Sequence, residues 1–283
     1  MVISKNEIIK SFGTPSAYSE NRLFHEFSDR GKEDVYYLMV LYGLSDLDMS
    51  DVTLSVSQRK ILNKTVRYQQ GRMKNILNFI ASRRPQGLWL DMGCGFGQFM
   101  YQIVQNEGNH AVGTDIKLGV LKKASFLLRQ LDCNKKYNFI NQSDRQLPFK
   151  NNSFDYVLSA DVLEHVGYEN QENVLSEIFR VLKNGGQAIV HTPNQNRVRI
   201  TTLLKKSYYL FRGIHPRDIT HAFPREHISL TTSKRLNTIC RSVGFISSTY
   251  HQMSCGQIVM PNIISLLFGH IVSRSFILVL TKK

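Results

Sequence analysis

The sequence predicts an α/β fold with a mainly parallel sheet, and three observations carry that prediction. From residue 87 onward, short apolar runs typical of strands alternate with segments of helical spacing, which indicates βαβ units. A glycine-rich turn at residues 92–97 directly follows the first run, and Asp115 ends the second. With 283 residues, the chain is long enough to bury such a core without disulfides or metal ions.

The elements follow in order along the chain. The first strand is predicted at residues 87–91, where an apolar run ends in an acid just before the glycines. The remaining strands are predicted at residues 110–115, 137–142, 154–161, 187–193, 244–250 and 275–283. Helical spacing predicts helices at residues 98–108, at about 117–131, and at 174–183.

The first 80 residues are predicted to be helical, apart from a loop near residues 45–57. Between residues 58 and 80, apolar residues recur at close to the 3.6-residue period of a helix. We expect residues 1–80 to form an N-terminal helical cap that contributes to a substrate enclosure. Residues 81–283 are then the main domain.

Composition and charge narrow the functional classes. Hydrophobic residues make up 42% and charged residues 20%, which excludes a disordered or collagen-like chain. The four cysteines have no paired spacing, which argues against a disulfide framework or a structural zinc site. The first residues lack the apolar stretch of a secretory signal, so we expect a cytoplasmic protein.

The positive charge is concentrated in the last third of the sequence. The net charge is +14, and residues 194–283 contain 13 Lys and Arg against 2 Asp and Glu. This asymmetry indicates an anionic partner, such as a phosphate, a nucleic acid or a membrane surface, or else a solvated basic face.

The glycine turn has the form Asp91-x-Gly93-x-Gly95-x-Gly97. Glycines allow the backbone to turn sharply and a ligand to approach the main chain, and the helix that follows presents free N–H groups. A nicotinamide-dinucleotide fingerprint requires G-x-G-x-x-G, whose third glycine would fall on Gln98, so that class of site is disfavoured.

Asp115 lies 18 residues beyond Gly97, at the end of the second predicted strand. At this position a carboxylate can accept hydrogen bonds from both hydroxyls of a ribose. The alternative is that Asp115 only caps the helix that begins near Lys117.

Together with three further segments, these motifs resemble class I S-adenosylmethionine-dependent methyltransferases, in particular the broad small-molecule and lipid group that includes ubiquinone-pathway O-methyltransferases. The further segments are residues 142–145, the Leu147-Pro148-Phe149 and Ser153-Phe154-Asp155 pair, and residues 177–186, in which Asn184 replaces the proline of many relatives. The resemblance spans about residues 87–193. It implies a Rossmann-like seven-stranded sheet whose last strand is antiparallel, and S-adenosylmethionine as the cofactor.

The resemblance also implies the cofactor-binding residues. Asp144 would face the adenine amino group, and Arg145 would donate a backbone N–H. The full implied set is Asp91, Gly93, Cys94, Gly95, Gly97, Asp115, Ile116, Asp144, Arg145, Ala160 and Asp161.

Asp161, Glu164 and His165 follow the fourth predicted strand at i, i+3 and i+4, on one face if the stretch is helical. The cluster could orient an acceptor with His165 as general base, bind a divalent cation, or brace the structure. His227 could also face the pocket. The candidate catalytic residues are therefore Glu164, His165 and His227, and no metal site is predicted.

The segment after the fourth strand argues against two nucleic-acid enzymes of the family. It lacks the [DN]PP[YW] sequence of base amino-group methyltransferases, and no cysteine lies where RNA cytosine C5 enzymes carry their nucleophile. The resemblance therefore favours transfer to oxygen of a small-molecule or lipid-like acceptor. The alternatives are an RNA- or protein-modifying methyltransferase, and a membrane-surface protein with a non-catalytic methyltransferase fold.

Residues 194–226 are longer than an ordinary connection and are predicted to form a lid. Basic residues alternate there with leucine and aromatic residues, which suits peripheral contact with anionic lipid, a grip on a phosphate-bearing acceptor, or a plain lid helix packed inward. The apolar segment 258–272 is too short to span a bilayer. It indicates either a lipid-like, apolar partner or packing against the N-terminal cap.

Overall fold

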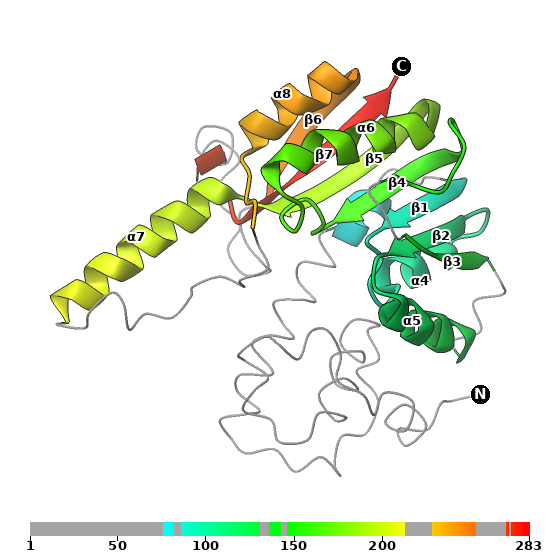
Figure 1. Cartoon of the computed structure of the whole chain (residues 1–283), viewed down its shortest axis with the longest axis horizontal. Coiled ribbons are helices and arrows are strands. Elements are labelled where there is room, and N and C mark those ends of the chain that lie inside the picture. Colours follow the sequence, from blue (N-terminus) through cyan, green and yellow to red (C-terminus); the bar gives the residue numbers. More distant parts are fainter. Residues whose placement is uncertain are drawn as a thin grey trace, which may run out of the picture. The chain divides into compact units, whose positions relative to one another are not determined.

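The computed structural model describes residues 76–81, 86–130, 136–142, 146–212, 228–252, 270–271 and 273–283 (Figure 1). Residues 76–81 are helical, as predicted. The other helices expected before residue 76, and the apolar segment up to residue 269, lie outside the described residues. The boundary predicted at residue 80 therefore stays a prediction.

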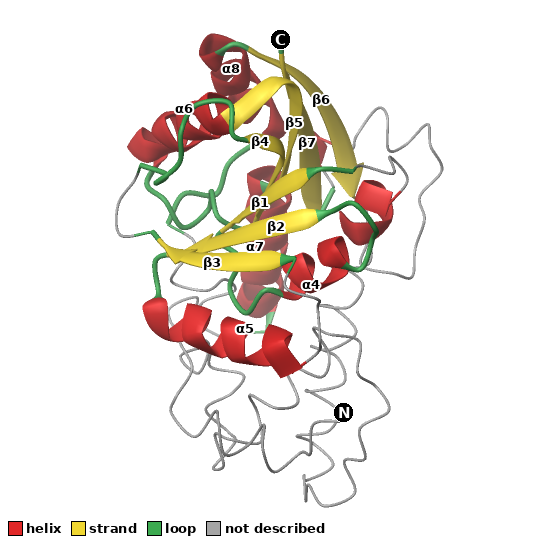
Figure 2. Ribbon diagram, turned by 90° about the vertical axis from the view of Figure 1, so that its right-hand side faces the viewer, coloured by secondary structure: helices red, strands yellow, loops and turns green. Residues whose placement is uncertain are grey.

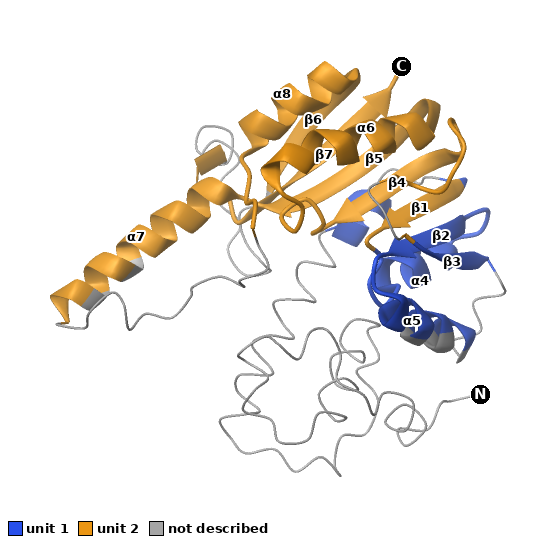
Figure 3. Ribbon diagram, viewed as in Figure 1, with its two compact units in different colours: residues 1–87, 94–141 blue, residues 88–93, 142–283 orange. Residues whose placement is uncertain are grey.

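The chain forms two compact units, residues 1–87 with 94–141 and residues 88–93 with 142–283 (Figure 3). The described elements of the first unit are α4 (Gln98–Val104), β2 (His110–Asp115), α5 (Leu118–Gln130) and β3 (Tyr137–Asn141). Those of the second unit are β1 (Leu88–Met92), β4 (Phe154–Ala160), a 3₁₀ turn (Tyr168–Asn170), α6 (Gln171–Val181), β5 (Leu182–Pro193), α7 (Gln195–Phe211), α8 (Ser233–Val243), β6 (Phe245–Gln252) and β7 (Ser275–Lys282).

All seven predicted strands are present, in one sheet with the order β3-β2-β1-β4-β5-β7-β6 (Figure 2). β4 pairs in parallel with β1 and β5, while β7 pairs antiparallel with β5 and β6. The predicted fold class is confirmed, including the antiparallel last strand.

β5 is buried on both faces along its second half. Ala188, Ile189 and Val190 are at most 2% exposed, and they pair with Val157 to Ser159 of β4 on one side and with β7 on the other. Continuous burial of this kind is typical of a strand covered by helices. β6, in contrast, alternates between exposed Ile246 and Tyr250 and less exposed neighbours, as expected for an edge strand.

Helix α6 is shorter at its end than the helical spacing predicts. The prediction extended to residue 183, whereas α6 ends at Val181 because Leu182 adopts extended backbone angles and pairs with Phe154 of β4. The reversal is completed by Gly185 at φ 77°, a conformation that glycine adopts readily. Pairing between distant strands therefore overrides a helical pattern that is purely local.

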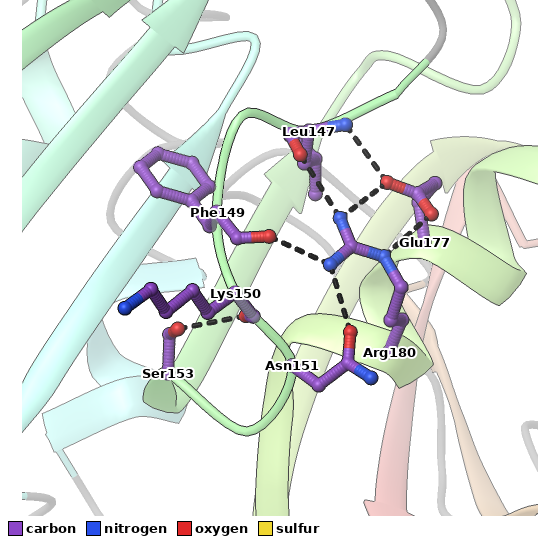
Figure 4. A network of polar contacts seen from close by, with 7 residues as sticks. All are labelled: Leu147, Phe149, Lys150, Asn151, Ser153, Glu177 and Arg180. Atoms are coloured by element: carbon purple, nitrogen blue, oxygen red, sulfur yellow. Dashed lines mark hydrogen bonds and ion pairs between the residues drawn. The ribbon is translucent and has the colours of Figure 1, made fainter.

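A polar network joins the loop before β4 to α6 (Figure 4). The Arg180 guanidinium donates to both carboxylate oxygens of Glu177 at 2.7–2.8 Å and to the carbonyl oxygens of Leu147 and Phe149 at 2.9 and 2.6 Å. Glu177 also accepts from the Leu147 N–H at 2.8 Å. Bidentate pairing of this type is among the stronger polar contacts in proteins, so the network stabilises the entry to β4.

We predict that Arg180→Ala lowers the free energy of unfolding by about 2–3 kcal/mol, because two loop carbonyls and the Glu177 carboxylate lose their donors. Chemical denaturation of the full chain measures this change. Arg241→Ala is the matched control, since Arg241 is an exposed arginine of α8 in the same unit, and its effect should stay within about 0.5 kcal/mol. Equal effects of the two substitutions would contradict the role given to the network.

The hydrogen bonds from Arg180 hold the pKa of Glu177 below its ordinary value of 4.5, despite opposition from partial burial. A carboxylate whose pKa is lowered in the folded state makes its whole contribution to the free energy of unfolding at pH values above the ordinary pKa. That stability is lost as the pH falls through the lower folded value. We therefore predict that the stability advantage of the native protein over Glu177→Gln is constant near neutral pH and shrinks below about pH 4.5. Urea titrations at several pH values measure it, and a gap that widens on acidification would contradict the assignment.

Candidate functional site

In the first unit, the second half of the glycine turn leads directly into α4. The Cys94 N–H donates to the Thr114 carbonyl oxygen at 2.9 Å, which ties the turn to β2. Gly97 precedes α4 at φ 79°, and a Cβ atom there would lie 3.2–3.3 Å from Phe139 and Leu128. The turn therefore requires glycine for both its backbone angles and its packing.

Asp115 joins the glycine turn to the start of α5. Its Oδ2 atom accepts from the Gly95 N–H at 3.1 Å, and its Oδ1 atom accepts from the Lys117 N–H at 2.9 Å. The contact expected of a helix cap is thus present. A carboxylate has about four acceptor positions, so these two bonds still leave capacity for ligand hydroxyls. The ribose-binding role of Asp115 stays a prediction.

Ile116, directly after Asp115, is 70% exposed. Its carbonyl oxygen and that of Asp115 accept from the Asn141 side-chain amide, at 3.2 and 2.9 Å. The backbone at the end of β2 is therefore held by β3 while the isoleucine side chain lies open to solvent. Asp144 and Arg145, predicted to contact adenine, lie outside the described residues.

In the second unit, the first half of the turn is equally constrained. Asp91 is buried in β1, with 1% of its surface exposed. Gly93 has φ 72°, and a Cβ atom there would lie 2.4 Å from Cγ2 of Val162. Close approach of the segment after β4 thus demands glycine at position 93.

The end of β4 is bound to the end of β5 through Asp161. Asp161 has φ 58°, which is uncommon for a residue other than glycine, and its N–H donates to the His191 carbonyl oxygen at 3.0 Å. The Nδ1 atom of His191 lies 2.7 Å from Oδ1 of Asp161, and His191 is 1% exposed. Backbone and side chain of Asp161 are therefore both held by one histidine.

His191 is a site residue that sequence reasoning missed. The available signal was a histidine inside the otherwise apolar run of residues 187–193, directly after three buried aliphatic residues. A titratable side chain at the carboxyl end of a buried parallel strand lies where open α/β sheets bind their ligands.

The condition for placing Asp161, Glu164 and His165 on one helical face is not met, since the stretch is not helical and residues 163–165 form a turn. Glu164 is fully buried; one carboxylate oxygen accepts from the Thr192 hydroxyl at 3.1 Å, and its backbone carbonyl accepts from the Ser229 N–H. His165, the next residue, is exposed. The contacts of Glu164 with Thr192 and Ser229 thus bury one side chain of this turn while the next one is exposed.

A second layer of polar contacts holds this turn. The Gln171 amide donates to the carbonyl oxygens of Leu163 and Ser229, and the Tyr168 hydroxyl donates to the Leu230 carbonyl oxygen. Tyr168 in turn accepts from the Gln195 amide at 3.0 Å. The segment from Ser229 is thereby fixed, while His227, two residues earlier, lies outside the described residues.

In the described part of the chain, no group of three His, Cys, Asp or Glu side chains is arranged to hold a metal ion. Cys94 and Cys240 are both buried thiols, and burial raises the pKa of Cys240 to about 12. A thiol with such a pKa is protonated at neutral pH and is a poor nucleophile.

Comparison with known proteins places this geometry in a family. The family model described as "Methyltransferase domain" matches residues 90–190, which include the glycine turn, Asp115 and the turn after β4. Over 109 residues the chain is 39% identical to an uncharacterised protein of Methanocaldococcus jannaschii, covering 38% of this chain and 42% of that protein. It is 32% identical over 116 residues to phosphoethanolamine N-methyltransferase 2 of Caenorhabditis elegans, covering 41% of this chain and 26% of that protein.

The chain thus spans less than half the length of these curated relatives. Among solved structures, a protein of Pyrococcus horikoshii superposes with a TM-score of 0.54 at 20% identity, covering 76% of this chain and 92% of that one. That likeness supports a shared fold. Residues 90–190 thus form a methyltransferase domain of the class I S-adenosylmethionine-dependent type, the family in which S-adenosylmethionine is the methyl donor.

Proposed function

We propose that the protein transfers a methyl group from S-adenosylmethionine to a small-molecule or lipid-like acceptor, at oxygen rather than at carbon or nitrogen. The observation that carries the proposal is the hydrogen bond between the glycine turn and Asp115 in the first unit. This bond joins two features of a cofactor site. The glycine turn lets a ligand approach the main chain closely, and the Asp115 carboxylate can accept hydrogen bonds from ribose hydroxyls.

The residues present suit the chemistry of this cofactor. S-adenosylmethionine carries a sulfonium and an ammonium group, both of which carboxylates stabilise, and two ribose hydroxyls. The cofactor-binding set contains the acids Asp91, Asp115 and Asp161, and the exposed Ile116 side chain offers apolar surface to an adenine ring. Bound S-adenosylmethionine would supply a methyl group for in-line displacement by a lone pair of the acceptor.

The two neighbouring candidates for acid–base work have different environments. Glu164 is fully buried against Thr192 and Ser229, which supports a bracing role. His165 is exposed at the same turn and is the better candidate to take the proton of an acceptor hydroxyl. His227 remains a second candidate for contact with the acceptor.

A small acceptor is supported by the relative whose name states that it methylates phosphoethanolamine. The basic residues of the last third would suit an anionic group on such an acceptor. The same charge favours a second candidate function, in which that region binds RNA or an acidic protein. The second candidate predicts that binding weakens steeply with salt, by about one log unit in affinity per tenfold change in salt for each phosphate contacted.

We predict that Asp115→Ala lowers the affinity for S-adenosylmethionine at least tenfold, because charge-assisted hydrogen bonds to the ribose would be lost, each worth about 1.5–3 kcal/mol. Isothermal titration calorimetry measures it. Glu107→Ala is the matched control, an exposed acid of the same unit that should leave the affinity unchanged.

Asp115 also holds Gly95 and Lys117, so the loss could be indirect. A 2′-deoxy analogue of S-adenosylhomocysteine separates the two effects. If Asp115 accepts from the ribose, the native protein should discriminate against the deoxy analogue and Asp115→Ala should not. Equal discrimination by both proteins would contradict direct contact.

We further predict that the protein transfers label from S-adenosylmethionine into an organic-soluble or small aqueous product of a cell extract, with Asp115→Ala as the blank. Extraction into organic, small aqueous and macromolecular fractions, followed by scintillation counting, measures it. Label confined to the macromolecular fraction would reject this acceptor class in favour of RNA or protein. Release of labelled methanol by mild alkali, which cleaves methyl esters, or of labelled methyl iodide by hydriodic acid, which cleaves methyl ethers, would support oxygen as the acceptor atom.

A further inference from the structure

Helix α7 carries an apolar surface that the described elements of the second unit leave exposed. From Leu203 to Arg212, every side chain that the structure describes is exposed. Leu203, Leu204, Tyr208 and Leu210 are 54–65% exposed and Phe211 is 91% exposed. Side chains of this size and type usually lie in a core, so a cluster of them on one projecting helix (Figure 1) indicates an interaction surface.

The first turn of α7, in contrast, is firmly anchored. Asn194 is 1% exposed, and its amide donates to the carbonyl oxygens of His270 and Ser273 at 3.1 Å. Its side-chain oxygen accepts from the Asn196 N–H at 3.1 Å, which caps the helix. The helix therefore leaves the unit in a defined direction with its second half unpacked.

The exposed residues form a stripe along the helix. Ile200, Leu204, Tyr208 and Phe211 recur at intervals of four, four and three residues, which places them on one face. Leu203 and Leu210, seven residues apart, widen this face on one side. The apolar stripe, as we call these six residues, runs nearly the full length of α7.

Basic residues border the apolar stripe, and acids are absent from the helix sequence. Between residues 195 and 212 there are five basic residues and no Asp or Glu: Arg197, Arg199, Lys205, Lys206 and Arg212. Lys206 is three and four residues from Leu203 and Leu210, and so lies along one edge. Arg212 marks the other edge, with its guanidinium 5.4 Å from the centre of the Tyr208 ring.

An apolar stripe between two basic edges matches the surface of an anionic bilayer. Leucine and aromatic side chains enter the boundary between headgroups and acyl chains, while lysine and arginine remain at the level of the phosphates. A second copy of the chain fits poorly as the partner. Two such helices in contact would each bring five positive charges, which would repel one another. RNA would use the basic residues but has no need of the exposed leucines.

We propose that α7 is an interfacial helix that binds the surface of a membrane rich in anionic lipid, with the apolar stripe inserted and the helix lying parallel to the bilayer. No helix in the described part of the chain is long and apolar enough to cross a membrane. The inference goes beyond the proposed methyl transfer, since it requires neither donor nor acceptor.

Co-sedimentation of the full chain with vesicles tests the proposal. The native protein should bind mixed phosphatidylglycerol and phosphatidylcholine vesicles, and bind phosphatidylcholine alone far less. Leu204→Gln with Phe211→Gln should lower the partition coefficient at least tenfold, because two apolar side chains no longer enter the bilayer. Ile246→Gln is the matched control, an exposed apolar residue of β6 whose loss should leave vesicle binding unchanged.

Charge is tested by Arg199→Gln with Lys206→Gln. The affinity of this variant for anionic vesicles should be about tenfold lower, and its affinity for neutral vesicles should be unchanged. The reason is that each cation near an anionic surface raises the affinity several-fold. Because the substituted side chains are exposed, thermal unfolding of all variants should match the native protein. Absence of native vesicle binding would overturn the proposal, as would equal binding by the Leu204 and Phe211 variant. A dimer that the same variant dissociates would also overturn it, in favour of a second copy.

Vesicle binding is measured without S-adenosylmethionine, so its failure is distinguishable from failure of methyl transfer. Binding to an RNA homopolymer in the same buffer gives the last comparison. RNA binding that depends on Arg199 and Lys206 but not on Leu204 and Phe211, together with weak vesicle binding, would assign the basic edges to nucleic acid and reject the lipid proposal.

Discussion

The double pairing of β5 is the constraint on which the second unit depends. β5 lies between parallel β4 and antiparallel β7, so its backbone position and register are set from both sides. Polar residues lie at its carboxyl end and just beyond it. His191 holds Asp161, Thr192 holds Glu164, and Asn194, just past the strand, caps α7. The part of the candidate site that lies in the second unit, and the start of α7, thus take their positions from one buried strand.

This arrangement places bracing residues and an exposed residue in one turn. Asp161 is bound to β5 through side chain and backbone, and Glu164 is bound to β5 through its side chain, whereas His165 in the same turn is exposed. In the first unit, Asp115 both braces the glycine turn and retains acceptor capacity. A site that must hold a donor and an acceptor in line benefits from such bracing, because misplacement by a fraction of an ångström is costly in rate.

The positive charge of the last third serves more than one purpose. Lys282 is 8% exposed, and its ammonium donates to Asn152 and to the carbonyl oxygens of Phe179 and Leu182, which joins β7 to the end of α6. Burial lowers the pKa of this lysine. Arg235 stacks over the Tyr168 ring at 5.0 Å, beside the turn after β4. Among the described basic residues of this region, Lys282 and Arg235 thus contribute contacts within the unit.

The sequence by itself determined the order of the seven strands, the three helices between the first five strands, the glycine turn and the acid that ends β2. These features depend on local periodicity, on turn residues and on short spacings, all of which can be read along the chain. The tertiary structure alone decided the end of α6 at Val181, the opposite environments of Glu164 and His165, and the role of His191. Each of these depends on the register between β4 and β5, which brings together residues about 30 positions apart. The exposure of Leu204 and Phe211 was likewise decided by packing, because an apolar stripe has the same spacing whether it faces a core or a membrane.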